Sequence, residues 1–227
     1  SQLPKYLQLP TGTDGFSQAQ RLFHGRGHAY QGLHHVTIDW LPPVTLITLF
    51  AAEPLTKIEA LADHLLRVLP HCTSIQLQHR YQRLGPVDVI RGEPMQKLTV
   101  QEGNLHFHIS LGQARNTGLF LDMKNGRHWV QTQSQDKRVL NLFAYTCGFS
   151  VAAIAGYAKS VLNVDMSSAA LTVGRENHRL NQQALAQVRF EKLNIFKSFS
   201  RLKKRGPFDL LICDPPTLQK GSVDIIR

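Results

Sequence analysis

Two kinds of hydrophobic pattern divide this chain. Residues 35–40 alternate apolar and polar side chains, so Val36, Ile38 and Trp40 can share one face of a strand. Residues 55–69 repeat apolar side chains at helical spacing. The elements predicted here are, in order, strands at residues 35–40 and 44–50, a helix at 55–69, and strands at 74–78, 98–101 and 105–109. Residues 31–112 are therefore predicted to form a small α+β domain.

The second half carries short apolar runs that do not alternate. Runs at residues 139–143, 160–164, 187–190 and 208–213 are typical of parallel strands buried on both faces. Helical patterns, at residues 149–157 and 169–181, separate the first three runs. This order predicts an α/β fold with a parallel sheet. We expect it to occupy residues 113–227.

Residues 1–30 contain glycine, histidine and arginine without a clear period, and we interpret them as a basic leader. Residues 21–28 in particular predict a loop. Two interpretations stay open for this loop. It is either a flexible contact with phosphates or an ordinary solvated segment.

The charge balance of the chain indicates what kind of partner it contacts. The 227 residues include 26 basic and 16 acidic side chains, a formal net charge of +10. This balance indicates a polyanionic partner, with nucleic acid as the first candidate, although a basic surface can also serve solubility alone. The basic run at residues 201–205 is most simply a solvated helix end. No apolar run is long enough to span a bilayer, and we expect no membrane partner.

Cysteine and histidine placement argues against disulfides and metals. The three cysteines are far apart and form no Cys-x-x-Cys pair, so we expect a reducing, cytoplasmic setting. The eleven histidines are scattered and lack acidic partners at ligand spacing. We therefore expect no metal site.

Polar residues lie at or near the predicted ends of the strands in the second half of the chain. Asn141, Asp165, Asn194 and Asp214 are the four residues. Ligands bind beyond the carboxyl ends of strands in open parallel sheets. Asp165 can accept hydrogen bonds from two ribose hydroxyls, and the neighbouring side chains can contact an adenine. The pattern therefore predicts a nucleoside site.

The turn at residues 144–148 limits which nucleoside-containing ligands are expected. It keeps Gly148 but has Tyr145 and Cys147 where a dinucleotide loop needs small residues. A pyrophosphate would approach such a turn poorly, whereas an amino-acid tail fits better. The turn therefore favours S-adenosylmethionine over NAD, which leaves an NAD-dependent oxidoreductase as a weaker alternative.

The segment joining the two halves adds a second candidate group. Phe120, Asp122 and Arg127 lie close together in a glycine-punctuated stretch. Arg127 could pair with a ligand carboxylate in a bidentate geometry that lysine cannot copy. The alternative is a structural ion pair between Asp122 and Arg127.

Three motifs in order carry a family resemblance: Asn-Leu-Phe-Ala-Tyr-Thr-Cys-Gly-Phe-Ser, Asn-Val-Asp-Met-Ser and Cys-Asp-Pro-Pro-Thr. They resemble the class I S-adenosylmethionine-dependent methyltransferases, in particular the bacterial branch that modifies guanine-N2 or cytosine-C5 of large-subunit ribosomal RNA. The resemblance implies a Rossmann-like domain preceded by a small α+β domain. It implies a cofactor site built from Phe120, Asp122, Arg127, Asn141, Phe143, Ala144, Tyr145, Gly148, Asp165, Met166, Asn194, Ile195 and Asp214.

The same resemblance implies the reaction and its partner. Asp214, Pro215 and Pro216 are expected to face the target base of an RNA. The family often places an aromatic residue after these prolines, where this chain has Thr217 and Leu218. A class I sheet has about seven strands, and only four are predicted here, so we expect a truncated sheet, weak cofactor binding and an exposed edge that could form a homodimer. The alternative is a non-catalytic RNA-binding module.

Overall fold

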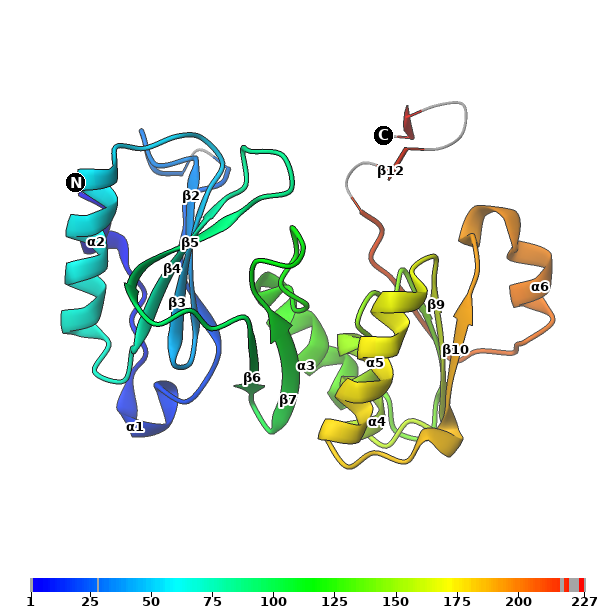
Figure 1. Ribbon diagram of the computed structural model, residues 1–227. Helices are drawn as coiled ribbons and strands as arrows, with labels where there is room; N and C mark the ends of the chain where they lie inside the picture. Colours follow the sequence, from blue (N-terminus) through cyan, green and yellow to red (C-terminus); the bar gives the residue numbers. More distant parts are fainter. Residues whose placement is uncertain (1, 28, 217–218, 221–224, 227) are drawn as a thin grey trace. The chain divides into compact units, whose positions relative to one another are not determined.

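A computed structural model describes residues 2–27, 29–216, 219–220 and 225–226 (Figure 1). The chain divides into two compact units, residues 1–122 and residues 123–227. The division falls ten residues beyond the boundary expected from the sequence. Within the described residues, no helix is both long and apolar enough to cross a membrane.

The N-terminal unit is a five-stranded sheet backed by one long helix. Strand order is β1-β2-β3-β4-β5, with only the β3–β4 pair parallel. Trp40, Ile47 and Leu65 are fully buried between the sheet and the helix. The elements are η1 (Leu3–Tyr6), α1 (Gly12–Gly15), β1 (Gln20–His24), β2 (Val36–Leu41), β3 (Val44–Leu49), α2 (Leu55–Val68), β4 (Ser74–His79), β5 (Val87–Gly92) and the separate hairpin β6 (Lys97–Glu102) and β7 (Leu105–Ser110). The predicted α+β elements are confirmed.

Two strands of this five-stranded sheet were not predicted. The expected loop at residues 21–28 was wrong, because Gln20–His24 form strand β1, in which Leu22 and Phe23 are both buried. A bulge between Arg21 and Phe23 shifts the register with β2, which lets two neighbouring side chains turn inward. The alternation that marks a strand is lost there. Strand β5 also pairs through a register shift and lies at a sheet edge, half exposed.

The C-terminal unit is built around a four-stranded parallel sheet of order β10-β9-β8-β11. The predicted parallel α/β arrangement is confirmed. Its elements are η2 (Leu121–Met123, at the division), α3 (Lys124–Gln133), β8 (Arg138–Leu142), α4 (Gly148–Ala155), β9 (Ser160–Asp165), α5 (Ser168–Leu180), η3 (Leu185–Gln187), β10 (Val188–Lys192), η4 (Ile195–Lys197), α6 (Phe199–Lys203) and β11 (Leu210–Cys213), with the short pair β12 (Gln219–Lys220) and β13 (Ile225–Ile226).

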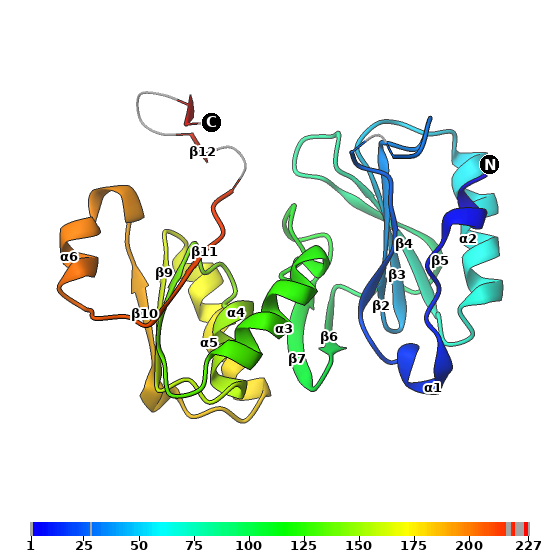
Figure 2. The same ribbon diagram turned by 180° about the vertical axis from the view of Figure 1, so that it is seen from behind.

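Helices cover both faces of this sheet (Figures 1 and 2). Val139 and Val161 point toward Val130 of α3 and Ala153 of α4. On the other face, alternate residues such as Leu140 pack with residues of η4 and α6. The order places β8 in the interior, with β9 following on one side and β11 on the other. That reversal is the switch point at which open α/β sheets bind ligands beyond the carboxyl ends of their strands.

Candidate functional site

Three of the four predicted strand-end residues lie at one edge of the parallel sheet, where its strands end. Asp165 is the last residue of β9, Asn194 follows β10, and Asp214 directly follows β11. The backbone nitrogen of Leu193 donates to the carbonyl oxygen of Asp165 at 3.0 Å, which fixes the β10 exit beside that of β9. The prediction that these polar residues share one edge is confirmed for the three.

Asn141 was expected at a strand tip and is not there. It lies inside β8 with 1% of its surface exposed, and its Nδ2 donates to Asn163 Oδ1 at 2.9 Å. The two asparagines are direct neighbours across the β8–β9 pair. The side chain of Asn141 therefore faces the buried layer between the sheet and α4.

The carboxylate of Asp165 joins two loops. Its Oδ2 accepts a hydrogen bond from the backbone nitrogen of Tyr145 at 2.8 Å, and its Oδ1 accepts one from Ser167 at 2.8 Å. A carboxylate has about four lone-pair positions, so two backbone donors leave acceptor capacity on both oxygens. Asp165 is partly exposed. Its free lone pairs can accept a pair of hydroxyl groups such as those of a ribose.

The loop between β8 and α4 has an unusual backbone. Phe143, Tyr145 and Cys147 have φ values of 55°, 48° and 62°, in the left-handed region. Non-glycine residues adopt this region at a cost of about 1 kcal/mol or more each, so the surrounding structure must hold them. Alternating left-handed residues turn successive backbone N–H groups, which is the geometry of an anion-binding nest.

Helix α5 supplies part of the restraint on this loop. Asn177 Nδ2 donates to the carbonyl oxygen of Thr146 at 2.9 Å. A Cβ atom at Gly174 would lie 2.4 Å from Cys147 Sγ and 2.9 Å from Cys147 Cβ. Only glycine at position 174 allows the loop and the helix to approach this closely. The loop that faces the candidate ligand is thus shaped by a helix about 30 residues later in the chain.

Helix α4 begins directly after the loop, at Gly148. Its first-turn N–H groups have no acceptor within the helix, so they can serve a ligand. The preceding Cys147 is fully buried, and burial first, then the Asp165 charge, raises the pKa of its thiol far above the usual range. Cys147 is therefore a packing residue that stays protonated, not a nucleophile.

A buried polar chain lies behind this loop, and the sequence interpretation missed it. Asn163 Nδ2 donates to Ser150 Oγ at 2.9 Å, and Ser150 Oγ lies 2.9 Å from His178 Nε2. On the other side of the ring, His178 Nδ1 lies 2.7 Å from Gln183 Oε1. Gln183 Nε2 donates to the carbonyl of Val151 at 2.9 Å. The chain links β9, α4 and α5.

The hydrogen-bond partners of His178 determine which of its ring nitrogens carries the hydrogen. Gln183 Oε1 can only accept, so His178 Nδ1 carries the hydrogen and Nε2 accepts the Ser150 hydroxyl. Desolvation by burial lowers the pKa of His178 to about 4. The ring is therefore neutral, and the hydrogen bonds from Asn163 through Ser150 and His178 to Gln183 can strengthen one another. The signal in the sequence was an asparagine inside each of two otherwise apolar runs, at positions 141 and 163.

The side chains expected around an adenine differ in how far they are exposed. Met166 is 49% exposed after β9, and the Phe143 ring lies 6.0 Å from that of Phe196. Asn194 caps η4, with its Oδ1 accepting from the Lys197 nitrogen at 3.3 Å. The side chain of Ile195 is buried in the core, so only its backbone could reach a ligand.

The predicted residues of the joining segment belong to different units. Phe120 and Asp122 lie in the N-terminal unit, whereas Arg127 lies in α3 of the C-terminal unit, 3% exposed. Asp122 lines a pocket of about 290 Å³ together with Arg21 and His24. Their role in the candidate cofactor site stays a prediction.

Asp214, Pro215 and Pro216 are exposed at the carboxyl end of β11. This exposure suits residues expected to face a large substrate. Thr217 and Leu218, where the family often has an aromatic residue, lie outside the described residues. Among the residues that the structure describes, no three His, Cys, Asp or Glu side chains form a metal-binding group.

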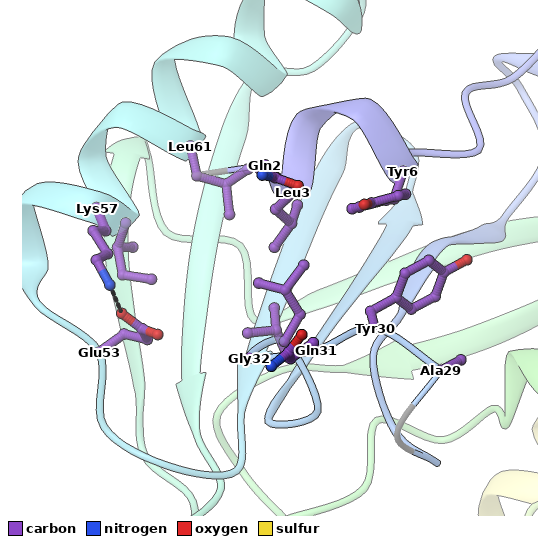
Figure 3. Close-up of a pocket in the computed structure, with 13 residues that line it drawn as sticks. Gln2, Leu3, Tyr6, Ala29, Tyr30, Gln31, Gly32, Glu53, Lys57 and Leu61 are labelled. Carbon is purple, nitrogen blue, oxygen red and sulfur yellow. Dashed lines mark ion pairs between the residues drawn. The ribbon is translucent and has the colours of Figure 1, made fainter.

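A larger pocket of about 660 Å³ lies in the N-terminal unit (Figure 3). Leu3 and Leu61 line its apolar part, and the Tyr6 and Tyr30 rings lie 4.8 Å apart beside them. Glu53 pairs with Lys57 at 3.2 Å. None of the predicted site residues lines this pocket, so its size does not identify it as the candidate site.

Comparisons with known proteins agree with the geometry. A family model described as S-adenosylmethionine-dependent methyltransferase matches residues 20–227. A ribosomal RNA large subunit methyltransferase I from Erwinia tasmaniensis is 31% identical over 95% of this chain and 54% of its own length. Its counterpart from Tolumonas auensis is 36% identical over 61% of this chain and 36% of its own length. The chain spans about half the length of the curated relatives that match most of it.

Solved structures show the same fold. A protein named only provisionally as a methyltransferase, complexed with SAH, matches with a TM-score of 0.81 at 22% identity, over 93% of this chain and 55% of its own. A SAM-dependent methyltransferase from Agrobacterium tumefaciens matches with a TM-score of 0.66 at 21% identity, over 85% of this chain and 61% of its own. The expected Rossmann-like methyltransferase fold is confirmed.

Proposed function

Because this chain belongs to the S-adenosylmethionine-dependent methyltransferase family, we propose that its C-terminal unit binds S-adenosylmethionine and that the protein methylates a base of large-subunit ribosomal RNA. The relatives that cover most of the chain are named for that RNA, which supports the substrate. The observation that carries the proposal is the Asp165 carboxylate, which joins the β8–α4 loop to the start of α5 while keeping free acceptor positions.

The donor set of the site fits this cofactor. Asp165 accepts the two ribose hydroxyls, and Met166 and Phe143 offer apolar surface to the adenine. Asn194 meets the polar edge of the adenine with its amide group. The N–H groups of Tyr145 and Cys147 are taken by Asp165 and Ala144, so the first-turn N–H groups of α4 face the carboxylate of the methionine end, which suits a helix N-terminus. Arg127, in the same unit, pairs with the carboxylate of the methionine end in this proposal.

When bound, the cofactor supplies an electrophilic methyl group on a sulfonium. The residues of this chain then have to align the nucleophile with it, which carries much of the rate enhancement in such a transfer. The Asp214 carboxylate and the Pro215 carbonyl accept hydrogens from an exocyclic amine and orient its lone pair. Pro216 stiffens the segment. The target base must be unpaired or flipped out to reach these groups.

Charge supports the RNA partner. Residues 123–227 contain 16 basic and 7 acidic side chains, so nine of the ten net positive charges belong to the C-terminal unit. The same unit holds the candidate cofactor site. A polyanionic substrate would therefore be drawn to the unit that acts on it.

Nucleoside mass spectrometry of large-subunit ribosomal RNA tests the function. Cells lacking the gene should lose one methylated base, and an Asp214→Ala allele should not restore it. Identical methylation in cells with and without the gene would contradict the proposal. RNA binding by the protein without any response to S-adenosylhomocysteine would favour the non-catalytic RNA-binding module instead.

The expected assembly and location belong to the same proposal. The edge strand β11 leaves Leu211 60% exposed, and pairing of two β11 strands would cover it as a homodimer. Light scattering of the wild type and of Leu211→Lys should then show dimer and monomer respectively. An RNA substrate in the ribosome places the protein in the cytoplasm.

A further inference from the structure

Six of the nine net positive charges of the C-terminal unit belong to one segment at an edge of its sheet. Residues 189–205 contain seven basic side chains and one acidic side chain. All seven are exposed: Arg189, Lys192, Lys197, Arg201, Lys203, Lys204 and Arg205. They come from the edge strand β10, from η4, from α6 and from the two residues after α6; β10 and α6 lie side by side in Figure 1. We call these residues the basic surface.

The single acidic residue of this segment does not neutralise the surface. Glu191 pairs with Arg205 at 2.9 Å and with Arg201 at 3.7 Å. Its side chain is only 16% exposed, and its ion pairs join β10 to α6 and to the residues that follow α6. Arg201 and Arg205 are thereby anchored, and the lysine side chains are exposed to solvent.

Two large aromatic side chains lie among these charges. Phe196 is 46% exposed and Phe199 is 59% exposed. Aromatic side chains next to cations are the elements with which proteins bind single-stranded nucleic acid, through stacked bases and phosphate contacts. A solvated helix end needs the cations but has no use for exposed phenylalanines.

The surface is preformed. Leu202 of α6 is 4% exposed and packs with Leu140 and Leu162 of the sheet. The Arg138 side chain donates to the carbonyl oxygen of Arg205 at 3.1 Å, which ties the end of α6 to β8. A rigid surface loses little conformational entropy when it binds.

We infer that the basic surface at residues 189–205 is a docking site for a single-stranded segment of the RNA substrate, with lysines on the phosphates and Phe199 stacked on a base. This inference rests on the proposed RNA substrate and adds a place where that RNA is held outside the methyl-transfer site. A single strand fits better than a duplex, because only unpaired bases expose faces to stack.

Charge removal tests the phosphate contacts. Lys203→Gln/Lys204→Gln should weaken binding of a fluorescein-labelled single-stranded RNA of about 12 nucleotides at least fivefold in anisotropy titrations. The slope of log K against log salt concentration should become less negative by about 1.4, because two phosphate contacts are lost. The matched control is Lys137→Gln/Lys159→Gln. It makes the same charge change where β8 and β9 begin, outside residues 189–205. The control should stay within about twofold of wild type.

Aromatic removal tests stacking separately. Phe199→Ala should weaken the same binding about fivefold or more without changing the salt dependence, since a stacked ring carries no charge. Tyr157→Ala is its control, because Tyr157 is 79% exposed near the start of β9. Equal losses in a variant and its control, or displacement of the RNA by polyglutamate at equal charge, would overturn the inference.

The thermal shift with S-adenosylhomocysteine, measured on the same five proteins, separates this inference from the proposed function. If all five respond to the compound but the two surface variants bind RNA as their controls do, the docking site is wrong and the methyltransferase proposal stands. If none responds but the surface variants alone lose RNA, the docking site stands and the proposed cofactor binding fails.

Discussion

Tyr145 and Asp165, 20 residues apart, are joined by a 2.8 Å hydrogen bond from the backbone nitrogen of Tyr145 to the Asp165 carboxylate. The bond connects the loop after β8 to the tip of β9. The same carboxylate accepts the Ser167 nitrogen, so one side chain orders both loops that face the candidate adenosine site. The cofactor loop and the ribose acceptor therefore cannot be changed independently.

Asp165→Asn should disturb the loop and the ligand together. An amide places an N–H₂ group against one of the two backbone donors, which leaves that donor unpaired at a cost of about 1–2 kcal/mol. We expect S-adenosylhomocysteine affinity to fall at least about tenfold, since a hydroxyl acceptor is lost as well. Calorimetry measures the affinity and urea unfolding the stability.

Asp136→Asn is the matched control for that variant. Asp136 is an exposed acid in the turn before β8, and its φ of 59° is one that asparagine tolerates. It should leave affinity and stability at wild-type values. Equal behaviour of the two variants would contradict the role given to the Asp165 carboxylate.

Gly174→Ala should show that α5 shapes the loop. The new Cβ would meet Cys147 Sγ at 2.4 Å, so the helix and the loop must move apart, at a cost of about 1–3 kcal/mol. Adding Cys147→Ala removes the sulfur and should recover part of both the stability and the ligand affinity. A double-mutant cycle with no coupling between positions 147 and 174 would contradict this packing account.

His178 should make the stability of the protein fall in mild acid. The folded-state pKa of about 4 lies below the ordinary histidine pKa of 6.5, so the unfolded chain binds the proton more readily. Stability is then fully present above 6.5 and is lost as the pH falls toward 4. From pH 7 to pH 5 the loss due to this ring is about 2 kcal/mol.

Urea unfolding at the two pH values isolates that effect. His178→Gln should be less stable than wild type at pH 7 but should lack this part of the acid loss. The exposed His128→Gln, in α3, should keep it. An unchanged pH dependence in His178→Gln would show that folding does not lower the pKa of this ring.

Cys147 should resist alkylation while Cys213 reacts. Cys147 is fully buried and its thiol pKa is raised, first by desolvation, whereas Cys213 is exposed at the end of β11. Only the thiolate is nucleophilic, so iodoacetamide under native conditions should label Cys213 and spare Cys147 until the chain is unfolded. Comparable labelling of both, by peptide mass spectrometry, would contradict the buried loop geometry.

The sequence predicted those parts of the fold that local patterns encode. Continuous apolar runs identified the parallel strands, because both faces of each strand are covered. Asp165 was found because a carboxylate closes one of those runs. Strand β1 was missed because the bulge at Arg21 and Phe23 breaks the alternation that a strand normally shows.

Long-range contacts explain the rest of what the sequence did not reveal. Asn141 looked like a strand end, but its partner Asn163 makes an interior position favourable for an amide. The left-handed backbone at Phe143, Tyr145 and Cys147 is held by Asn177 and Gly174, about 30 residues away. Such restraints appear only once the chain is folded.

The central claim is that polar groups at the carboxyl edge of the β10-β9-β8-β11 sheet hold an adenosine with an amino-acid tail. Two-dimensional NMR of ¹⁵N-labelled protein, titrated with S-adenosylhomocysteine and separately with NAD, tests it even if binding is weak. The account predicts saturable shifts of the Tyr145, Gly148, Met166 and Asn194 amides with S-adenosylhomocysteine, and none there with NAD. Unchanged amides at these positions, or equal shifts with NAD, would contradict it.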